Sequence, residues 1–312
     1  MSITILSDLQ NIMDKYRHGV VAIGNFDGVH IAHQKLLYDA VQLAQQYNTF
    51  PSVLTFTPHP KDFFSKSSQH FLTTFEDKIE LFASMGIKVV YNVTFDEALA
   101  KMSAAEFCKL LFTQLKVRHI LCGYNFHFGH GRKGDANFLR DSASIYSANC
   151  SVNDRIMAKG KLVSSSNIKL LLQQGCTCRA AELLGRPHSM QGVLLQGYNN
   201  EYCSKDELYH TAINIKYSYA PILPGNYCVK VILGGGHILG GVAEIKGHVY
   251  DMKNYNLIFH TTERVAATAN ANCSVQVYDL LHPAQFNLSE SERQWQLEND
   301  IKGAAYLKNF TE

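Results

Sequence analysis

Two histidines, His30 and His33, lie three residues apart where a glycine-containing turn meets a helical pattern. Residues at this spacing share one face of a helix, so both imidazoles can reach the same pocket. An imidazole donates hydrogen bonds to phosphate oxygens, and such donors stabilise charge that develops in a transition state. Asp27 lies three residues before His30 and can position a metal ion or a substrate hydroxyl. This arrangement predicts nucleotide chemistry.

The flanking residues predict the elements that hold these side chains in place. Residues 20–23 are apolar and mostly β-branched, which is typical of a short buried strand. Gly24 and Gly28 allow a sharp turn and a close approach to a ligand. From 33 to 44 apolar residues recur at helical spacing. The start of a helix offers free N–H groups and a partial positive charge, so this strand–turn–helix unit suits phosphate binding.

The histidine pair is also compatible with two roles that involve no nucleotide. His30 and His33 can simply cap or decorate the start of a helix, which is the commoner role of two histidines at this spacing. The flanking Gly-Asn-Phe-Asp-Gly favours the phosphate interpretation. A zinc site is the third alternative, but no further pair of ligands follows at metal-site spacing.

The segment 24–34, GNFDGVHIAHQ, resembles the HxGH signature of the adenylyltransferases, in the variant of prokaryotic bifunctional riboflavin kinase/FAD synthetases. Ala32 replaces the usual glycine between the histidines. The resemblance implies a Rossmann-like nucleotidyltransferase domain with a parallel sheet, which transfers AMP from ATP to FMN and yields FAD and pyrophosphate. It also implies site residues. The catalytic ones are Asp27, His30 and His33, the ATP-binding ones include Gly24, Phe26 and Gly28, and Asn25 contacts the flavin.

Two further segments resemble flavin-binding motifs of the same family. Residues 54–60, LTFTPHP, are similar to its LTFxPHP segment and imply flavin contacts from Pro58 and His59; alone they are equally typical of a proline-rich turn. Residues 123–135 are similar to its GxDFxFGxxRxGD loop, in which glycines allow close approach and a basic pair can contact phosphate. That resemblance implies flavin and nucleotide contacts from Asn125, Phe128, Arg132 and Asp135. The alternative is a glycine-rich surface loop.

Residues 163–169, VSSSNIK, resemble the ISSTxIR motif, the second phosphate-binding signature of the family. The resemblance implies that Ser164, Ser165 and Lys169 bind the β- and γ-phosphates. At the variable position of this motif the family usually carries an arginine, where this chain has Asn167, and its loss removes a bidentate contact worth about 1–3 kcal/mol. A lysine is a point charge and does not replace the planar guanidinium. This departure leaves open a pseudoenzyme that binds flavin or ATP without turnover.

The first half of the chain alternates strand and helix patterns, which predicts a parallel sheet covered by helices on both faces. Expected strands are 52–56, 89–93 and 119–122, and expected helices are 75–85, 104–114, 164–172 and 178–184. Gly185-Arg186-Pro187 then breaks the pattern and predicts a boundary between domains 1–184 and 185–312. Later runs predict a small antiparallel barrel with strands 192–196, 211–216, 227–233, 239–245, 256–261 and 273–278, followed by a helix from Ser289.

The second domain resembles a riboflavin kinase module whose catalytic signature is damaged. The family's GxxLGFPTAN segment corresponds to residues 204–214, where Thr211 remains as a candidate metal ligand and Ile213 replaces the asparagine. Asn256 takes the position of the general base, a glutamate; Glu244 and Glu263 lie nearby but do not fit the strand pattern. The run 234–236 predicts a hairpin turn in preference to a phosphate loop. We expect the kinase activity to be lost or strongly reduced.

Composition limits the remaining possibilities. The chain has 312 residues, a net charge of +2 and 46% hydrophobic residues, which indicates a globular protein without a nucleic-acid or membrane partner. No run of about 18 apolar residues predicts a membrane span, and the eight scattered cysteines and the lack of a basic leader favour a cytoplasmic location. Expected ligands are ATP, Mg²⁺, FMN or FAD and, for the second domain, riboflavin. A different phosphorylated acceptor, such as nicotinamide mononucleotide, stays open, as does the oligomeric state.

Overall fold

The computed structural model divides into two compact units, which are described separately. The first comprises Met1–Gln69 and Phe75–Val163, and the second His70–Thr74 and Ser164–Glu312. The structure describes residues 3–9, 11–65, 70–195, 201–203, 208–215, 219–245, 256–263, 265, 270–284, 292, 296–297 and 299–301, of which 201–203, 208 and 256 are described by backbone alone.

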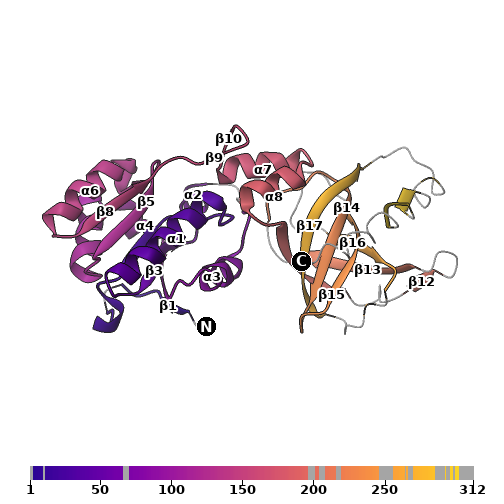
Figure 1. Ribbon diagram of the computed structural model, residues 1–312, viewed down its shortest axis with the longest axis horizontal. Helices are drawn as coiled ribbons and strands as arrows, with labels where there is room; N and C mark the ends of the chain where they lie inside the picture. Colours follow the sequence, from indigo (N-terminus) through magenta and orange to yellow (C-terminus); the bar gives the residue numbers. More distant parts are fainter. Residues whose placement is uncertain are drawn as a thin grey trace. The chain divides into compact units, whose positions relative to one another are not determined.

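The first unit is an α/β fold with a six-stranded, fully parallel sheet, seen in Figure 1. Its strand order is β1-β4-β3-β2-β5-β8. The chain adds β3 and β4 on one side of β2 and β5 on the other, so the strand order reverses at β2. Open parallel sheets bind ligands at the carboxyl ends of the strands at such a reversal. The strands are β1 (Thr4–Leu6), β2 (Val20–Ile23), β3 (Pro51–Thr57), β4 (Val89–Thr94), β5 (His119–Gly123) and β8 (Asn149–Asn153).

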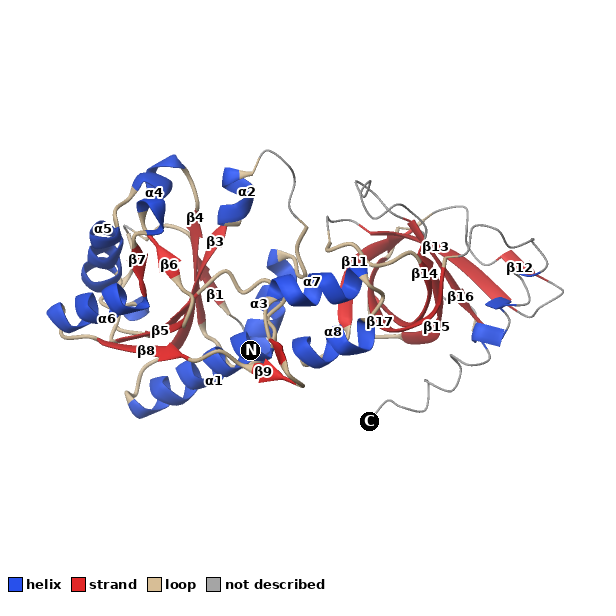
Figure 2. Cartoon of the chain, turned by 90° about the horizontal axis from the view of Figure 1, so that it is seen from above, coloured by secondary structure: helices blue, strands red, loops and turns tan. Residues whose placement is uncertain are grey.

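Helices cover both faces of this sheet, as predicted, and Figure 2 shows α1 on the side opposite α5 and α6. Val20 and Ala22 pack with α1 (Ile31–Gln46) and α3 (Phe75–Ser84). Val21 and Ile23 pack with the other face, because successive side chains of a strand point to opposite sides. That face is covered by α5 (Ala104–Lys109), the π-helical turn η2 (Leu110–Gln114) and α6 (Ala136–Ile145).

Shorter elements complete the first unit. Three of them lie in the connections that the site uses: α2 (Pro60–Phe64) after β3, and the small hairpin of β6 (His127–Phe128) and β7 (Gly134–Asp135) after β5. The others are η1 (Asp14–Tyr16), α4 (Glu97–Lys101), η3 (His130–Arg132), β9 (Met157–Ala158) and β10 (Lys161–Leu162).

The second unit carries an antiparallel sheet whose strand order is β11-β17-β14-β15-β16-β13-β12, with an additional pairing between β11 and β13. Two helices precede it, α7 (Ser165–Gln173) and α8 (Thr177–Leu184). The strands are β11 (His188–Leu194), β12 (Glu201–Cys203), β13 (Leu208–Ile215), β14 (Gly225–Leu233), β15 (Ile238–Ile245), β16 (Asn256–Thr261) and β17 (Asn272–Pro283).

The chain passes from the first unit to the second between Val163 and Ser164, whereas the sequence pattern predicts a boundary after residue 184. The difference arises because α7 and α8 pack with the antiparallel sheet. Leu223 N donates to Leu172 O at 3.0 Å, and the Cys178 thiol lies 3.5 Å from Tyr278 O. Gly185 has a φ of 74° and forms the left-handed C-cap of α8. It therefore marks the end of a helix inside the second unit. The functional assignment of 1–184 and 185–312 stays a prediction.

Two predictions for the second half have different outcomes. The run 234–236 is a hairpin turn between β14 and β15, as predicted: Gly235 and Gly236 have φ angles of 104° and 86°, and Gly236 N donates to Leu233 O at 2.9 Å. Ser289 and most of the predicted last helix lie outside the described residues. The described residues of that stretch, 292, 296–297 and 299–301, are helical. In the described part of the chain, no helix is long and apolar enough to cross a bilayer.

Candidate active site

The turn between β2 and α1 is held in an unusual backbone conformation. Phe26, Gly28 and Val29 have φ angles of 53°, 84° and 41°, in the left-handed region that non-glycine residues rarely adopt. The Phe26 and Val29 side chains are fully buried against the α1 side of the sheet, and Val29 N donates to Phe26 O at 3.1 Å. This packing maintains the strained backbone and fixes the positions of Asp27 and His30, both of which are buried.

The two histidines meet in one stacked pair at the start of α1. Their ring centroids are 3.6 Å apart and the rings are inclined by 12°. His30 is also the N-cap of α1, because its Nδ1 accepts a long hydrogen bond of 3.4 Å from His33 N. An Nδ1 that accepts leaves the proton of a neutral imidazole on Nε2, which is then a donor. The capping role and the predicted phosphate role are therefore compatible for His30.

Desolvation keeps His33 in its neutral form. The pKa of His33 lies well below 6.5, chiefly because its charged form is desolvated and also because His30 and Lys78 are close. The His33 Nδ1 is buried and has no hydrogen-bond partner among the described residues, while the edge of the ring meets Phe26 at 5.2 Å between centroids. A neutral imidazole still carries one N–H, which can donate to a phosphate oxygen.

This lowered pKa predicts a pH-dependent stability. At pH values between the folded-state pKa and the ordinary value of 6.5, the unfolded chain binds more protons at this position than the folded chain does. The free energy of unfolding therefore decreases as the pH falls below about 6.5. The slope contributed by one group is at most about 1.4 kcal/mol per pH unit. Urea unfolding followed by circular dichroism at several pH values gives the free energy of unfolding as a function of pH. We expect this free energy to depend less steeply on pH in His33→Gln than in the wild type. Equal pH dependence in the two proteins contradicts the assignment.

Lys78 lies beside the same turn, and the sequence patterns did not single it out. It projects from the buried face of α3, its Nζ donates to Asn25 O at 3.4 Å, and the residue is 9% exposed. Burial lowers the pKa of Lys78, while the nearby carboxylates of Asp27 and Glu76 raise it. The signal was present in the spacing, because Phe75, Lys78 and Phe82 fall on one helical stripe. A lysine on an apolar stripe marks a buried charge.

The loop after β5 begins next to β2. Its residues that are predicted to bind the flavin and the nucleotide divide into two groups. Asn125, Arg132 and Asp135 are exposed, and Asp135 also caps α6 by accepting from Phe138 N at 2.8 Å. Phe128 is buried in the core and its ring lies 5.4 Å from that of Phe107. In this conformation Phe128 holds the loop to α5, and a flavin contact from Phe128 stays a prediction.

Gly129 determines how closely this loop approaches α5. Its φ and ψ are 72° and 168°, a combination that is accessible essentially to glycine only, and a Cβ there would lie 2.6 Å from Ala104 N. We expect Gly129→Ala to lower the free energy of unfolding by about 2–4 kcal/mol. Gly131→Ala is the matched control: φ is 64°, the nearest neighbour is 4.0 Å away, and the expected cost is about 1 kcal/mol. Equal midpoints for the two variants in thermal unfolding contradict this role of Gly129.

The loop after β3 carries the other predicted flavin residues. The peptide bond before Pro58 is cis, and Pro58 is exposed. His59 is the N-cap of α2, and its Nδ1 accepts from Lys61 N at 3.0 Å. Because β3 and β5 flank β2 in the parallel sheet, the turns that follow these three strands leave the same edge of the sheet.

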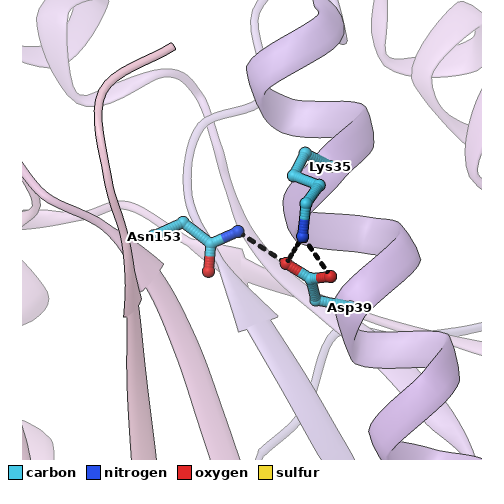
Figure 3. Close-up of polar contacts among 3 residues, drawn as sticks. All are labelled: Lys35, Asp39 and Asn153. Carbon is cyan, nitrogen blue, oxygen red and sulfur yellow. Dashed lines mark hydrogen bonds and ion pairs between the residues drawn. The ribbon is translucent and has the colours of Figure 1, made fainter.

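A polar contact ties α1 to the end of β8 (Figure 3). Asn153 Nδ2 donates to Asp39 Oδ2 at 2.8 Å, and Lys35 Nζ donates to both oxygens of the same carboxylate at 2.6 Å. The Asn153 carbonyl also accepts from Tyr124 N at 2.9 Å, at the start of the loop after β5. Asn153 thus connects the helix that carries the histidines to the loop that carries Asn125.

The predicted ligands of the β- and γ-phosphates belong to the second unit. Ser164 is the N-cap of α7 and accepts from Asn167 N at 3.3 Å, and Ser165 is the first residue of that helix. Lys169 Nζ donates to His70 O at 2.6 Å and lies 5.1 Å from the centre of the Phe71 ring. Lys169 therefore anchors the His70–Thr74 segment, and phosphate binding by these residues stays a prediction.

The kinase-like positions lie on two neighbouring strands of the second unit. Thr211 in β13 is buried and its hydroxyl has no hydrogen-bond partner within the described residues. Ile213 is fully buried, and Asn256 in β16 stands opposite Asn214 in the ladder. Within the described residues, no group of three or more His, Cys, Asp or Glu side chains is arranged to bind a metal ion.

Comparison with known proteins identifies the family. The FAD synthetase family model matches residues 12–167. The bifunctional riboflavin kinase/FMN adenylyltransferase of Bacillus subtilis is 31% identical and covers 75% of this chain and 73% of its own. The protein of the same name from Listeria monocytogenes is 30% identical, with coverages of 88% and 82%.

A solved structure described as a macrolide-efflux protein from Streptococcus pneumoniae shares the fold: its TM-score is 0.85 at 18% identity, with 97% of this chain and 98% of that chain covered. At this identity the likeness concerns the fold alone. The family model and the two relatives carry the assignment of family. The chain belongs to the FAD synthetase family and is an FAD-synthesising enzyme, as the sequence predicted.

Proposed function

We propose that the chain transfers AMP from ATP to FMN at the turn between β2 and α1. The observation that carries this proposal is the stacked pair of His30 and His33, 3.6 Å apart, at the amino end of α1 and at the strand where the sheet order reverses. A phosphate oxygen of FMN attacks the α-phosphorus of ATP, the bond from that phosphorus to the bridging oxygen breaks, and pyrophosphate leaves. No covalent enzyme intermediate is needed, so positioning and charge neutralisation provide the rate.

The two imidazoles would act as donors to the α- and β-phosphates. His30 can donate from Nε2 because its Nδ1 accepts from the helix backbone, and His33 is neutral because desolvation lowers its pKa. The free N–H groups at the start of α1 add a partial positive charge. Gly24, Phe26 and Gly28 shape the turn against which the nucleotide would lie.

Magnesium is proposed as the metal of the reaction, with Asp27 as its candidate carboxylate ligand. Mg²⁺ in nucleotide sites is bound by one or two carboxylates together with phosphate oxygens, so a single buried carboxylate beside the histidines fits this ion. When bound, Mg²⁺ would supply charge screening for the triphosphate. Asp27 would hold it.

The flavin would be contacted from the loops after β2, β3 and β5. Asn25, Pro58 and His59 come from the first two loops, and Asn125, Arg132 and Asp135 from the third. In support, these strands are neighbours in the parallel sheet and share its carboxyl edge. The buried Asn25 Oδ1 has no hydrogen-bond partner among the described residues, so it can accept from a ligand.

For the second unit we propose a closed riboflavin kinase-like barrel without kinase activity. The pairing of β11 with both β17 and β13 supports closure. The absence of a metal-binding side chain at Ile213, and the amide at Asn256 where a general base is expected, support the loss of activity.

Binding of ATP to the histidine pair can be tested by long-range ¹H–¹⁵N spectra of the imidazoles. We expect the His30 and His33 ring nitrogens, assigned with single variants, to shift on addition of a non-hydrolysable ATP analogue, and FAD to form when FMN and ATP are supplied. Unchanged ring resonances under saturating analogue refute the location. Ring shifts with no pyrophosphate release would instead indicate a flavin- and ATP-binding protein without turnover, which the missing arginine at Asn167 keeps as the second candidate.

A further inference from the structure

We propose that Lys78 is a positioning residue of the adenylyl transfer site. It ties α3 to the β2–α1 turn through the Asn25 carbonyl, and the Asp27 carboxylate of that turn is among the charged groups near it. This inference rests on the proposed function of that turn.

The burial of Lys78 is the first reason. An ammonium group is costly to remove from water unless it has partners. Lys78 is 9% exposed and lies on the same face of α3 as the buried Phe82. The hydrogen bond from its Nζ to Asn25 O is long at 3.4 Å. If Lys78 only filled space in the core, an apolar side chain would stabilise the fold better. The ammonium group therefore has a role at the turn.

The position of the carbonyl is the second reason. Asn25 follows Gly24 directly and begins the turn in which Phe26, Gly28 and Val29 have left-handed backbone conformations. A donor on the Asn25 carbonyl restrains the entry to that turn, and the turn carries both Asp27 and His30. A displacement of about 1 Å in a reacting group can cost about 100-fold in rate, so a restraint on the turn acts on catalysis without touching substrate.

The electrostatic surroundings are the third reason. The titratable groups that interact with Lys78 are Asp27 on the turn, Glu76 on its own helix, and His33, which stacks on His30. A cation at Lys78 disfavours protonation of His33. This effect suits a site in which His33 donates as a neutral imidazole.

The inference is tested with Lys78→Gln, Lys78→Met and Lys78→Arg. We expect Lys78→Gln and Lys78→Met to lower kcat/KM for FAD formation by about 100-fold, with most of the loss in kcat. Lys78→Arg, which keeps the charge and the donor, should stay within about 10-fold of the wild type. In the two neutral variants the acid limb of the kcat/KM profile should move to higher pH, because His33 loses a neighbouring cation. Lys101→Met removes the same charge from an exposed site, 70% accessible, and should leave the rate unchanged.

Lys78→Gln has a shorter, uncharged polar side chain and serves if Lys78→Met does not fold. A wild-type rate and pH profile in folded Lys78→Gln overturns the inference, and so does a loss in Lys78→Arg as large as that in Lys78→Met. These results are separable from a failure of the proposed function, which would appear as unimpaired FAD formation in a variant without the His30 imidazole.

Discussion

Replacing His30 by asparagine is expected to lower the rate of FAD formation by about 100- to 1,000-fold while leaving the fold intact. Loss of a single preorganised donor to developing charge costs this much in other enzymes. Asparagine is among the best N-cap residues, so its side-chain oxygen can accept from His33 N as the imidazole Nδ1 does. The variant thus removes the proposed donor and keeps the cap.

The comparison with His30→Ala separates catalysis from capping. Alanine removes both roles, so we expect the same loss of rate together with a decrease of about 1 kcal/mol in the free energy of unfolding. His237→Asn, at the exposed hairpin between β14 and β15, is a matched control that should change neither quantity. Chromatography of the flavin products and thermal unfolding give the two readouts. A wild-type turnover in His30→Asn would remove the imidazole from the mechanism.

Riboflavin and ATP are expected to yield no FMN with this chain, whereas FMN and ATP yield FAD. The second unit resembles a riboflavin kinase. That reaction needs a side chain that binds magnesium and a base that takes the proton of the riboflavin hydroxyl. Ile213 is buried and apolar, and an amide at Asn256 cannot accept a proton. The loss of a general base alone accounts for about 100- to 10,000-fold in rate.

This experiment has a natural positive control in the bifunctional relative from Bacillus subtilis. Both proteins are incubated with riboflavin and ATP and then with FMN and ATP, and the flavins are separated by chromatography. FMN formation by this chain at the rate of the control would show that other residues supply the base and the metal ligand. FAD formation from FMN by this chain serves as an internal control for its folding.

Local patterns in the sequence determined the elements that carry the site. The strand at Val20–Ile23, the turn at Gly24–Gly28 and the helix after it follow from β-branched residues, glycines and helical periodicity, all within one short segment. The hairpin at 234–236 follows for the same reason. β1 and β8 escaped prediction because they are edge strands with few buried residues, and their pairing depends on β4 and β5, which are distant in sequence.

Only the tertiary structure decided which charges are buried and what they meet. The sequence places Lys78 on the apolar stripe of its helix, but its contact with the Asn25 carbonyl exists only because α3 packs beside the β2–α1 turn. The lowered pKa of His33 and the burial of Phe128 likewise depend on side chains brought together from separate elements. The end of a helix at Gly185 is encoded locally, but the division between the units is not, because α7 and α8 join the second unit through long-range packing. Element type depends on neighbours along the chain, whereas desolvation and charge coupling depend on neighbours in space.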